Sequence, residues 1–310
     1  MNSSLNRRDF IKLGGGALAA GALMPGSLFA KEKGEGEGEG KLEIKKAIMF
    51  ATVPGGGSLM DKFKMIRDAG FDGVEPNSGL DRDEILKARD ASGLKIASVC
   101  DSVHWVKPLS DPNPETRKVG LEGLKTALED AAMYGASSVL LVPGVVNKGI
   151  SYDDAYKRSQ EEIHKAIPVA EKYKVKIAIE NVWNQFLLSP LEAARYVDEF
   201  NSPWVGWHFD IGNVITYGWP EQWIKVLGKR IQKLHVKEFS RKKRDSEGLY
   251  AGFKVDYLEG DNNWPAIMKA LDEVGYKGWA IAEPAYHPEG VEPAARLKQI
   301  VEKMDKILAL

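Results

Sequence analysis

The 310-residue chain has one cysteine, five histidines and almost no net charge. A single cysteine, Cys100, excludes a disulfide scaffold. With 43 basic against 44 acidic residues, the chain lacks the basic excess with which a nucleic acid backbone is bound. Its apolar content of 44% excludes low-complexity disorder. The composition is that of an ordinary globular enzyme of one or two domains.

The first thirty residues differ in character from the rest. Residues 6–12 contain the pair Arg7-Arg8, and a weakly apolar, Gly/Ala-rich run follows over residues 13–30. This order resembles a twin-arginine export signal, and the run is too short and too rich in glycine to span a bilayer as a stable helix. The alternative is an amphipathic surface helix. We expect residues 1–30 to be a signal peptide that engages the twin-arginine export machinery and delivers the protein to the periplasm without a membrane anchor.

A Gly/Glu-rich stretch follows the expected signal. It opens with KEKGEGEGEGK, which has no apolar side chain to bury, so we expect a flexible linker over residues 31–43. Removal of residues 1–30 takes away three basic side chains and one acidic side chain, so the net charge falls from −1 to −1 − 2 = −3. The folded domain is expected over residues 44–310.

From residue 45 onward, eight short apolar runs alternate with longer segments of helical periodicity. This alternation indicates βα units and a parallel sheet. No G-x-G-x-x-G follows the first run, and eight units in about 270 residues favour a single (β/α)8 TIM barrel of the α/β class over a doubly wound sheet. The expected strands are 47–51, 73–75, 95–99, 138–142, 176–180, 205–210, 233–236 and 279–283. The expected helices are 59–69, 83–92, 115–134, 152–173, 191–200, 222–229, 264–274 and 294–309.

Four successive expected strands close with Glu180, Asp210, His235 and Glu283. Catalytic groups of such barrels lie at the C-terminal ends of the strands, and each of these groups is costly to bury without a partner. Taken singly, each residue is more often a hydrogen-bonded side chain at a loop start. Together at one mouth, the carboxylates would repel one another unless a cation lay between them. We expect one divalent metal ion, with Mn²⁺, Mg²⁺ or Co²⁺ favoured by the oxygen ligands and Zn²⁺ tolerated.

Several motifs carry a family resemblance. They are G-F-D-G-V-E at 70–75, I-E-N at 179–181, H-F-D-I-G-N at 208–213, L-H-V-K at 234–237 and G-D-N-N-W at 260–264. This set resembles the sugar phosphate isomerase/epimerase superfamily, which shares a xylose isomerase-like barrel, and the resemblance extends from about residue 45 to the C-terminus. It implies that Glu180, Asp210, His235 and Glu283 hold the metal, and that the two glutamates also move a proton. It further implies substrate contacts at His208 and Arg241.

Two departures from the epimerase pattern leave the substrate open. Leu187 stands where the epimerases commonly have a sugar-binding glutamate. The basic segment 241–254 is longer than a small-sugar epimerase requires, and it is either a solvated loop or a site for an anion.

Three further residues are candidates for substrate binding. Glu75 ends the second expected strand and either binds substrate or pairs with a lysine. His104, beside Trp105 in a loop, suits the face of a sugar, although a packed loop aromatic is the alternative. Lys237, two residues after His235, either holds a substrate oxygen or forms an interior ion pair with a carboxylate.

The leading hypothesis is a metal-dependent sugar isomerase or epimerase that works through an enediolate, with proton transfer between Glu180 and Glu283. One alternative is a 3-keto-glycoside lyase or hydrolase that uses the same metal site, and another is a non-catalytic sugar-binding barrel. The expected partner is a small carbohydrate and not a nucleic acid, and an oligomer is compatible with the sequence.

Overall fold

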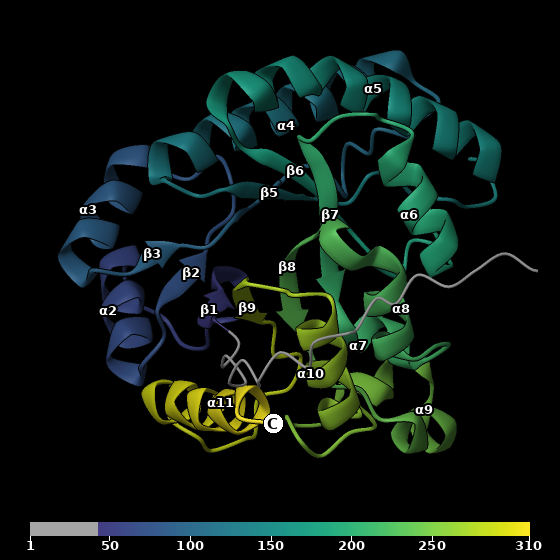
Figure 1. The fold of residues 1–310 in the computed structure, drawn as a ribbon. Coiled ribbons are helices and arrows are strands. Elements are labelled where there is room, and N and C mark those ends of the chain that lie inside the picture. Colours follow the sequence, from purple (N-terminus) through teal and green to yellow (C-terminus); the bar gives the residue numbers. More distant parts are fainter. Residues whose placement is uncertain (1–42) are drawn as a thin grey trace, which may run out of the picture. The chain divides into compact units, whose positions relative to one another are not determined.

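Nine short parallel strands run through residues 43–310, the part of the chain that the computed structural model describes. The expected signal peptide and the linker up to residue 42 lie outside the described residues. The strand order β3-β2-β1-β9-β8-β7-β6-β5-β4 goes once around a nearly closed barrel, with helices outside it (Figure 1). This arrangement confirms the predicted TIM barrel.

The ninth strand arises because the third barrel position is divided. β3 (Lys95–Ile96) pairs with β2, β4 (Val99–Cys100) pairs with β5, and Ala97 and Ser98 separate the two. The other strands agree with the predicted ones to within a few residues. They are β1 (Ile44–Met49), β2 (Gly73–Glu75), β5 (Ser138–Leu141), β6 (Lys176–Glu180), β7 (Val205–Asp210), β8 (Ile231–Val236) and β9 (Gly278–Ala282).

The long helices also begin and end within about two residues of their predicted positions, an error typical of helix boundaries. Side-chain caps define several of them; Ser58, for example, forms a capping box with Asp61. Within residues 43–310, no helix is both long and apolar enough to cross a bilayer. The helices are α2 (Leu59–Ala69), α3 (Arg82–Ser92), α4 (Pro114–Tyr134), α5 (Tyr152–Tyr173), α6 (Pro190–Asp198), α8 (Pro220–Leu227), α10 (Trp264–Glu273) and α11 (Pro293–Leu308).

Short helices follow two of the strands that carry predicted metal residues. α7 (Ile211–Ile215) starts directly after β7, while α9 (Arg241–Glu247) and the 3-10 helix η3 (Leu249–Phe253) follow β8. The basic segment 241–254 is therefore largely helical and not the solvated loop of the first interpretation. Ser240 caps α9 by accepting from the backbone of Lys243. Segments this short do not show helical periodicity, so the sequence pattern missed them.

Side chains of β1 illustrate how the strands divide the apolar core. Ile48 belongs to the large cluster between strands and helices, whereas its neighbour Ala47 belongs to a small cluster with Ala97 and Ile281. Successive side chains of a strand point to opposite faces. The large cluster with Ile48 therefore lies between the strands and the helices, and the small cluster with Ala47 lies in the barrel interior.

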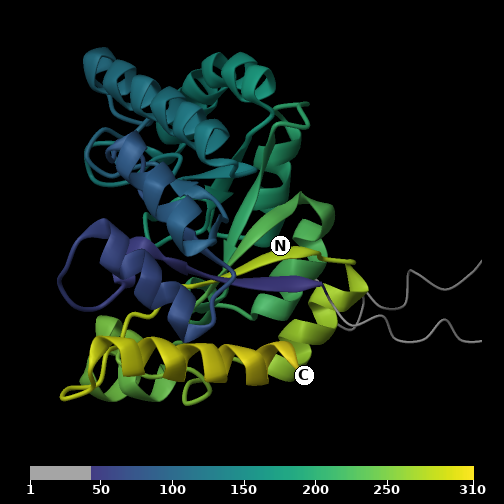
Figure 2. The same ribbon diagram turned by 90° about the vertical axis from the view of Figure 1, so that its left-hand side faces the viewer.

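The C-terminal helix α11 is tied to the segment that follows β8. It packs against α2, β1 and α10 (Figures 1 and 2). Arg296 of α11, which is 2% exposed, donates two hydrogen bonds of 2.8 Å to the carboxylate of Asp256. The next residue, Tyr257, donates to the carbonyl of Val236 at 2.7 Å, directly after His235. This ion pair therefore supports the strand end that carries His235.

We expect Asp256→Ala to lower the free energy of unfolding by about 3–5 kcal/mol, because it leaves the Arg296 guanidinium buried without its partner. Urea denaturation measures the change. Lys303→Ala is the control, since Lys303 contacts the same carboxylate from a more exposed position and should cost about 1 kcal/mol or less. Equal costs for the two variants would contradict this role for the Arg296 pair.

Candidate active site

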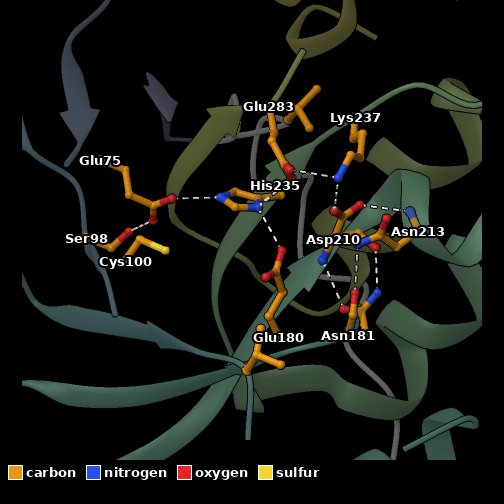
Figure 3. Close-up of polar contacts among 12 residues, drawn as sticks. Glu75, Ser98, Cys100, Glu180, Asn181, Asp210, Asn213, His235, Lys237 and Glu283 are labelled. Carbon is orange, nitrogen blue, oxygen red and sulfur yellow. Dashed lines mark hydrogen bonds and ion pairs between the residues drawn. The ribbon is translucent and has the colours of Figure 1, made fainter. Parts of the chain in front are cut away.

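Four side chains meet at the C-terminal end of the barrel: Glu180 from β6, Asp210 from β7, His235 from β8 and Glu283 just after β9 (Figure 3). Each offers one ligand atom, and these four atoms lie within 4.8 Å of one another. His235 Nδ1 is 2.9 Å from both Glu180 Oε1 and Glu283 Oε2. The fold thus brings together the four residues expected to hold a metal.

The other ring nitrogen of His235 contacts Glu75. Nε2 lies 2.8 Å from Glu75 Oε1, and Glu75 also accepts from the hydroxyl of Ser98. Glu75 is completely buried, so it neither lines the cavity nor pairs with a lysine, in contrast to both sequence interpretations. A carboxylate behind a histidine fixes its tautomer and ring orientation. Glu75 consequently directs Nδ1 of His235 toward Glu180 and Glu283.

Lys237 forms an interior ion pair, the second of its two interpretations. Its Nζ lies 2.8 Å from Glu283 Oε1 and 3.2 Å from Asp210 Oδ2, and the side chain also lines the cavity. Gly212 of α7 makes room beside it, because a Cβ at residue 212 would lie 2.8 Å from Lys237 Cβ and from its carbonyl oxygen. The glycine of the D-I-G-N motif therefore allows α7 to pack closely against β8.

The three carboxylates differ in their affinity for a proton. Burial raises the pKa of Glu180 despite the opposing charge of His235. Burial likewise raises the pKa of Asp210 to about 7, with Lys237 opposing it. In Glu283 the effect of burial is outweighed by Lys237 and then His235, which hold its pKa below the usual range. Glu180 and Glu283 thus form a pair of carboxyl groups whose environments shift their pKa values in opposite directions.

A cavity of about 320 Å³ opens over this cluster. This volume is at the lower end of the range for small-molecule sites. Its polar lining includes Glu180, His235, Lys237, Glu283, His104 and Asn213, and its aromatic lining consists of Trp105, Trp183, Tyr250 and Phe253. Aromatic rings beside a few convergent polar groups suit a sugar, whose C–H faces pack on rings while its hydroxyls form hydrogen bonds.

His104 lies in the cavity wall, as expected for a residue that contacts substrate. Its Nδ1 accepts a hydrogen bond of 3.1 Å from the backbone N–H of Val142. Burial lowers the pKa of His104 to about 4, so the ring is neutral near pH 7. With Nδ1 acting as an acceptor, the proton is on Nε2. His104 is therefore a neutral hydrogen-bond donor.

His208 does not reach the cavity, although a substrate contact was expected. It is completely buried, its ring nitrogens have no hydrogen-bond partner among residues 43–310, and its ring centroid lies 4.2 Å from that of His235. Side chains two residues apart on a strand share a face but lie in different layers of a barrel. His208 consequently occupies the layer below Asp210.

Arg241 is also placed away from the cavity lining. Its guanidinium donates to the carbonyls of Ile215 and Gly218 at 2.9 Å each, and it lies 5.4 Å from the centre of the Trp219 ring. Because Arg241 is the first residue of α9, its side chain anchors that helix to the end of α7. Arg241 therefore lies outside the set of residues that line the cavity, and the contact with substrate implied by the resemblance stays a prediction.

Two asparagines that the sequence interpretation did not single out hold Asp210. Asn181 accepts from the backbone N–H of Asp210 at 3.0 Å and donates to its carbonyl at 2.7 Å. Asn213 donates its backbone N–H to Asp210 Oδ1 at 2.9 Å, and its side chain donates to the carbonyl of Asn181 at 3.0 Å. The sequence signal for Asn213 is its position three residues after Asp210. The side chain of a helix N-cap residue accepts a hydrogen bond from the backbone N–H at that position.

Comparisons with known proteins agree with this architecture. The model of the xylose isomerase-like TIM barrel family matches residues 63–307. L-ribulose-5-phosphate 3-epimerase UlaE of Escherichia coli O1:K1 / APEC is 24% identical over 269 residues, which cover 82% of this chain and 92% of that protein. The uncharacterized protein MJ1311 of Methanocaldococcus jannaschii is 26% identical over 236 residues, which cover 73% of this chain and 76% of that protein.

Solved structures show the same fold. A D-tagatose 3-epimerase-like protein superposes with a TM-score of 0.70 at 21% identity, covering 86% of this chain and 98% of that chain. The 3-keto-D-glucoside 4-epimerase YcjR from E. coli superposes with a TM-score of 0.69 at 17% identity, covering 86% of this chain and 100% of that chain. Since the family match extends over well more than half of its length, the chain belongs to the xylose isomerase-like TIM barrel family.

Proposed function

We propose that this protein is a divalent-metal-dependent sugar isomerase or epimerase in which Glu180 and Glu283 transfer a proton at the carbon beside a carbonyl. The observation that carries the proposal is the convergence of three carboxylates, Glu180, Asp210 and Glu283, with His235 within 4.8 Å of one another. Glu180, His235 and Glu283 line a small cavity, and Asp210 lies buried behind them. The epimerases among the relatives support the reaction class.

The donor set fits a metal ion. Glu283 Oε2 is buried and, within residues 43–310, makes no well-aligned hydrogen bond, although it lies 2.9 Å from His235 Nδ1. The two atoms are thus directed at the same point, where a cation could bind both. Glu180, Asp210 and Glu283 would supply oxygen and His235 would supply nitrogen, a combination that suits Mn²⁺, Mg²⁺ or Co²⁺ and tolerates Zn²⁺. A bound divalent ion would polarise the sugar carbonyl and stabilise the negative charge that develops on its oxygen.

The two glutamates have complementary proton affinities. Glu283, kept ionised beside Lys237, is placed to accept the proton from the α-carbon of the keto sugar. Glu180, whose pKa is raised by burial, is placed to return a proton to the enediolate. Return to the opposite face of the same carbon gives the epimer. Return to the former carbonyl carbon, with the proton of the α-hydroxyl passing to the former carbonyl oxygen, gives the isomer. His104 and Asn213 line the cavity where the sugar hydroxyls need partners.

Elimination from a 3-keto-glycoside is the second candidate for the same groups. Removal of the same α-proton would be followed by cleavage of the glycosidic C–O bond, and the departing oxygen would take a proton from Glu180. An apolar cavity of about 230 Å³ beside the catalytic cavity favours this candidate, since it has room for a leaving group.

Addition of Mn²⁺ should stabilise the folded protein. At a concentration about 100 times Kd, mass action contributes about 2.7 kcal/mol and raises Tm by about 5 °C for a domain of this size, and a chelator reverses the shift. Asp210→Asn should lose most of the shift, whereas the exposed Asp245→Asn should keep it. An unchanged Tm together with no Mn²⁺ binding in calorimetry would refute the metal site.

Replacement of Glu75 tests its action through His235. Glu75→Ala should raise the Kd for Mn²⁺ by about 10–100-fold, because His235 loses the carboxylate that orients it. Ser98→Ala removes the other partner of Glu75 and should have a smaller effect. Calorimetric titration measures both constants, and equal affinity in wild type and Glu75→Ala would show that His235 needs no such support.

Incubation of the Mn²⁺-loaded protein with keto sugars in D₂O tests the reaction itself. We expect exchange of the α-proton, followed by NMR, and a loss of at least about 100-fold in Glu180→Gln and in Glu283→Gln. Both variants also lose a metal ligand, so the rates are compared at saturating Mn²⁺ after Kd has been measured. If no keto sugar exchanges with the metal bound, the proposed function fails.

A further inference from the structure

A second cavity, of about 230 Å³, adjoins the catalytic one and differs from it in chemistry. The segment after β6 contributes Val182, Trp183, Gln185 and Leu188, and the segments after α7 and α9 contribute Thr216, Tyr217, Leu249 and Tyr250. None of these side chains is charged. Its surface is mainly apolar and aromatic, in contrast to the carboxylates and the lysine of the catalytic cavity.

Three residues, Val182, Trp183 and Tyr250, line both cavities. Trp183 is fixed in place: its indole N–H donates to the carbonyl of Asn213 at 2.9 Å, and its ring packs against Phe253 at 4.7 Å between centroids. Tyr250 forms the outer part of the wall and is 71% exposed. A ligand that reacts over His235 can therefore extend past Tyr250 into the second cavity without leaving the protein surface.

The wall formed by the segment after β6 is preorganised. Gln185 and Leu187 adopt φ values of 59° and 55°, a left-handed conformation that is unfavourable for residues other than glycine. The surroundings hold this backbone in place: Asn184 donates to the carbonyl of Gly144 at 2.7 Å, and the backbone N–H of Leu187 donates to the Tyr152 hydroxyl at 2.9 Å. Leu187 itself is buried in the core, so Leu188 is the leucine that faces the cavity.

We propose that the second cavity is a subsite for an apolar aromatic substituent of the sugar, so that the substrate class is an aryl glycoside or its keto derivative. The inference rests on the proposed function for the identity of the reacting group. Gln185 and Thr216 are the polar aliphatic side chains of the lining, so a second sugar ring would leave most of its hydroxyls against Val182, Leu188 and Leu249, which cannot form hydrogen bonds with them. An aromatic ring loses no hydrogen bonds there and packs against Trp183 and Tyr217.

The exposure of the lining supports a ligand as the occupant. Leu188, Leu249 and Tyr217 are 54%, 49% and 45% exposed. Contiguous apolar groups left open to water beside polar groups that bind substrate are typical of a ligand groove. The two cavities share the wall formed by Val182, Trp183 and Tyr250. A short substituent on a sugar bound in the catalytic cavity is therefore enough to reach the second cavity.

Equilibrium binding tests the subsite without turnover. Calorimetry on the Mn²⁺-loaded full-length protein compares 4-nitrophenyl glucoside with methyl glucoside, each as both anomers. We expect at least one anomer of the aryl glucoside to bind about tenfold more tightly than its methyl counterpart, because the ring buries apolar surface. Leu188→Asp and Leu249→Asp should each remove this preference, and Leu191→Asp, on an exposed position outside both cavities, should retain it.

Several outcomes would overturn the subsite. They are equal affinity for the two glucosides, no detectable binding of the aryl glucoside, and a preference that survives both aspartate variants. A dimer that Leu249→Asp dissociates in sedimentation experiments would also overturn it, since a second copy would then cover the cavity. If the aryl preference holds while no keto sugar exchanges its proton, the subsite stands and the proposed reaction fails, so the two failures are distinguishable.

Discussion

The barrel mouth is organised around an excess of buried negative charge. Glu75, Glu180, Asp210 and Glu283 are four carboxyl groups in contact with two basic groups, His235 and Lys237. If all are ionised the cluster has a charge of 2 − 4 = −2, which is costly in a medium of low dielectric constant. Protonation of Glu180 and Asp210, whose pKa values are raised, reduces this charge, and a divalent cation would do so more completely. The same imbalance would favour a bound cation and accompanies the opposite pKa shifts of Glu180 and Glu283.

Much of this arrangement follows from the sequence because it depends on local regularities. The strands were recognisable from short apolar runs between amphipathic segments, and parallel strands in a barrel all present their C-terminal ends at one rim. A carboxylate or imidazole at the end of four successive runs therefore had to gather at that rim. This reasoning needed no knowledge of packing, and the four predicted metal residues lie together as expected.

Other parts of the site depend on the way the barrel closes, which no local pattern records. His208 and Asp210 share a strand face, but the stagger between strands decides which of them joins the cluster of Glu180 and Glu283. Glu75 lies 160 residues before His235 in the chain and meets it across the barrel. Arg241 was expected to contact substrate, but it begins a helix that is too short to show periodicity. This helix directs its side chain toward α7.

The break in the third barrel strand has a consequence for the chain's one cysteine. Cys100 follows the break, lines the catalytic cavity and is 4% exposed. Burial, reinforced by the negative charge of Glu75 and Glu180, raises the pKa of its thiol well above the usual value. Since the thiolate is the form that attacks disulfides and reacts with oxidants, this shift favours the less reactive thiol form of the sulfur. The carboxylates gathered at the cavity thereby also lower the reactivity of the thiol in its wall, so one cluster of charges governs both a candidate site and the stability of its lining.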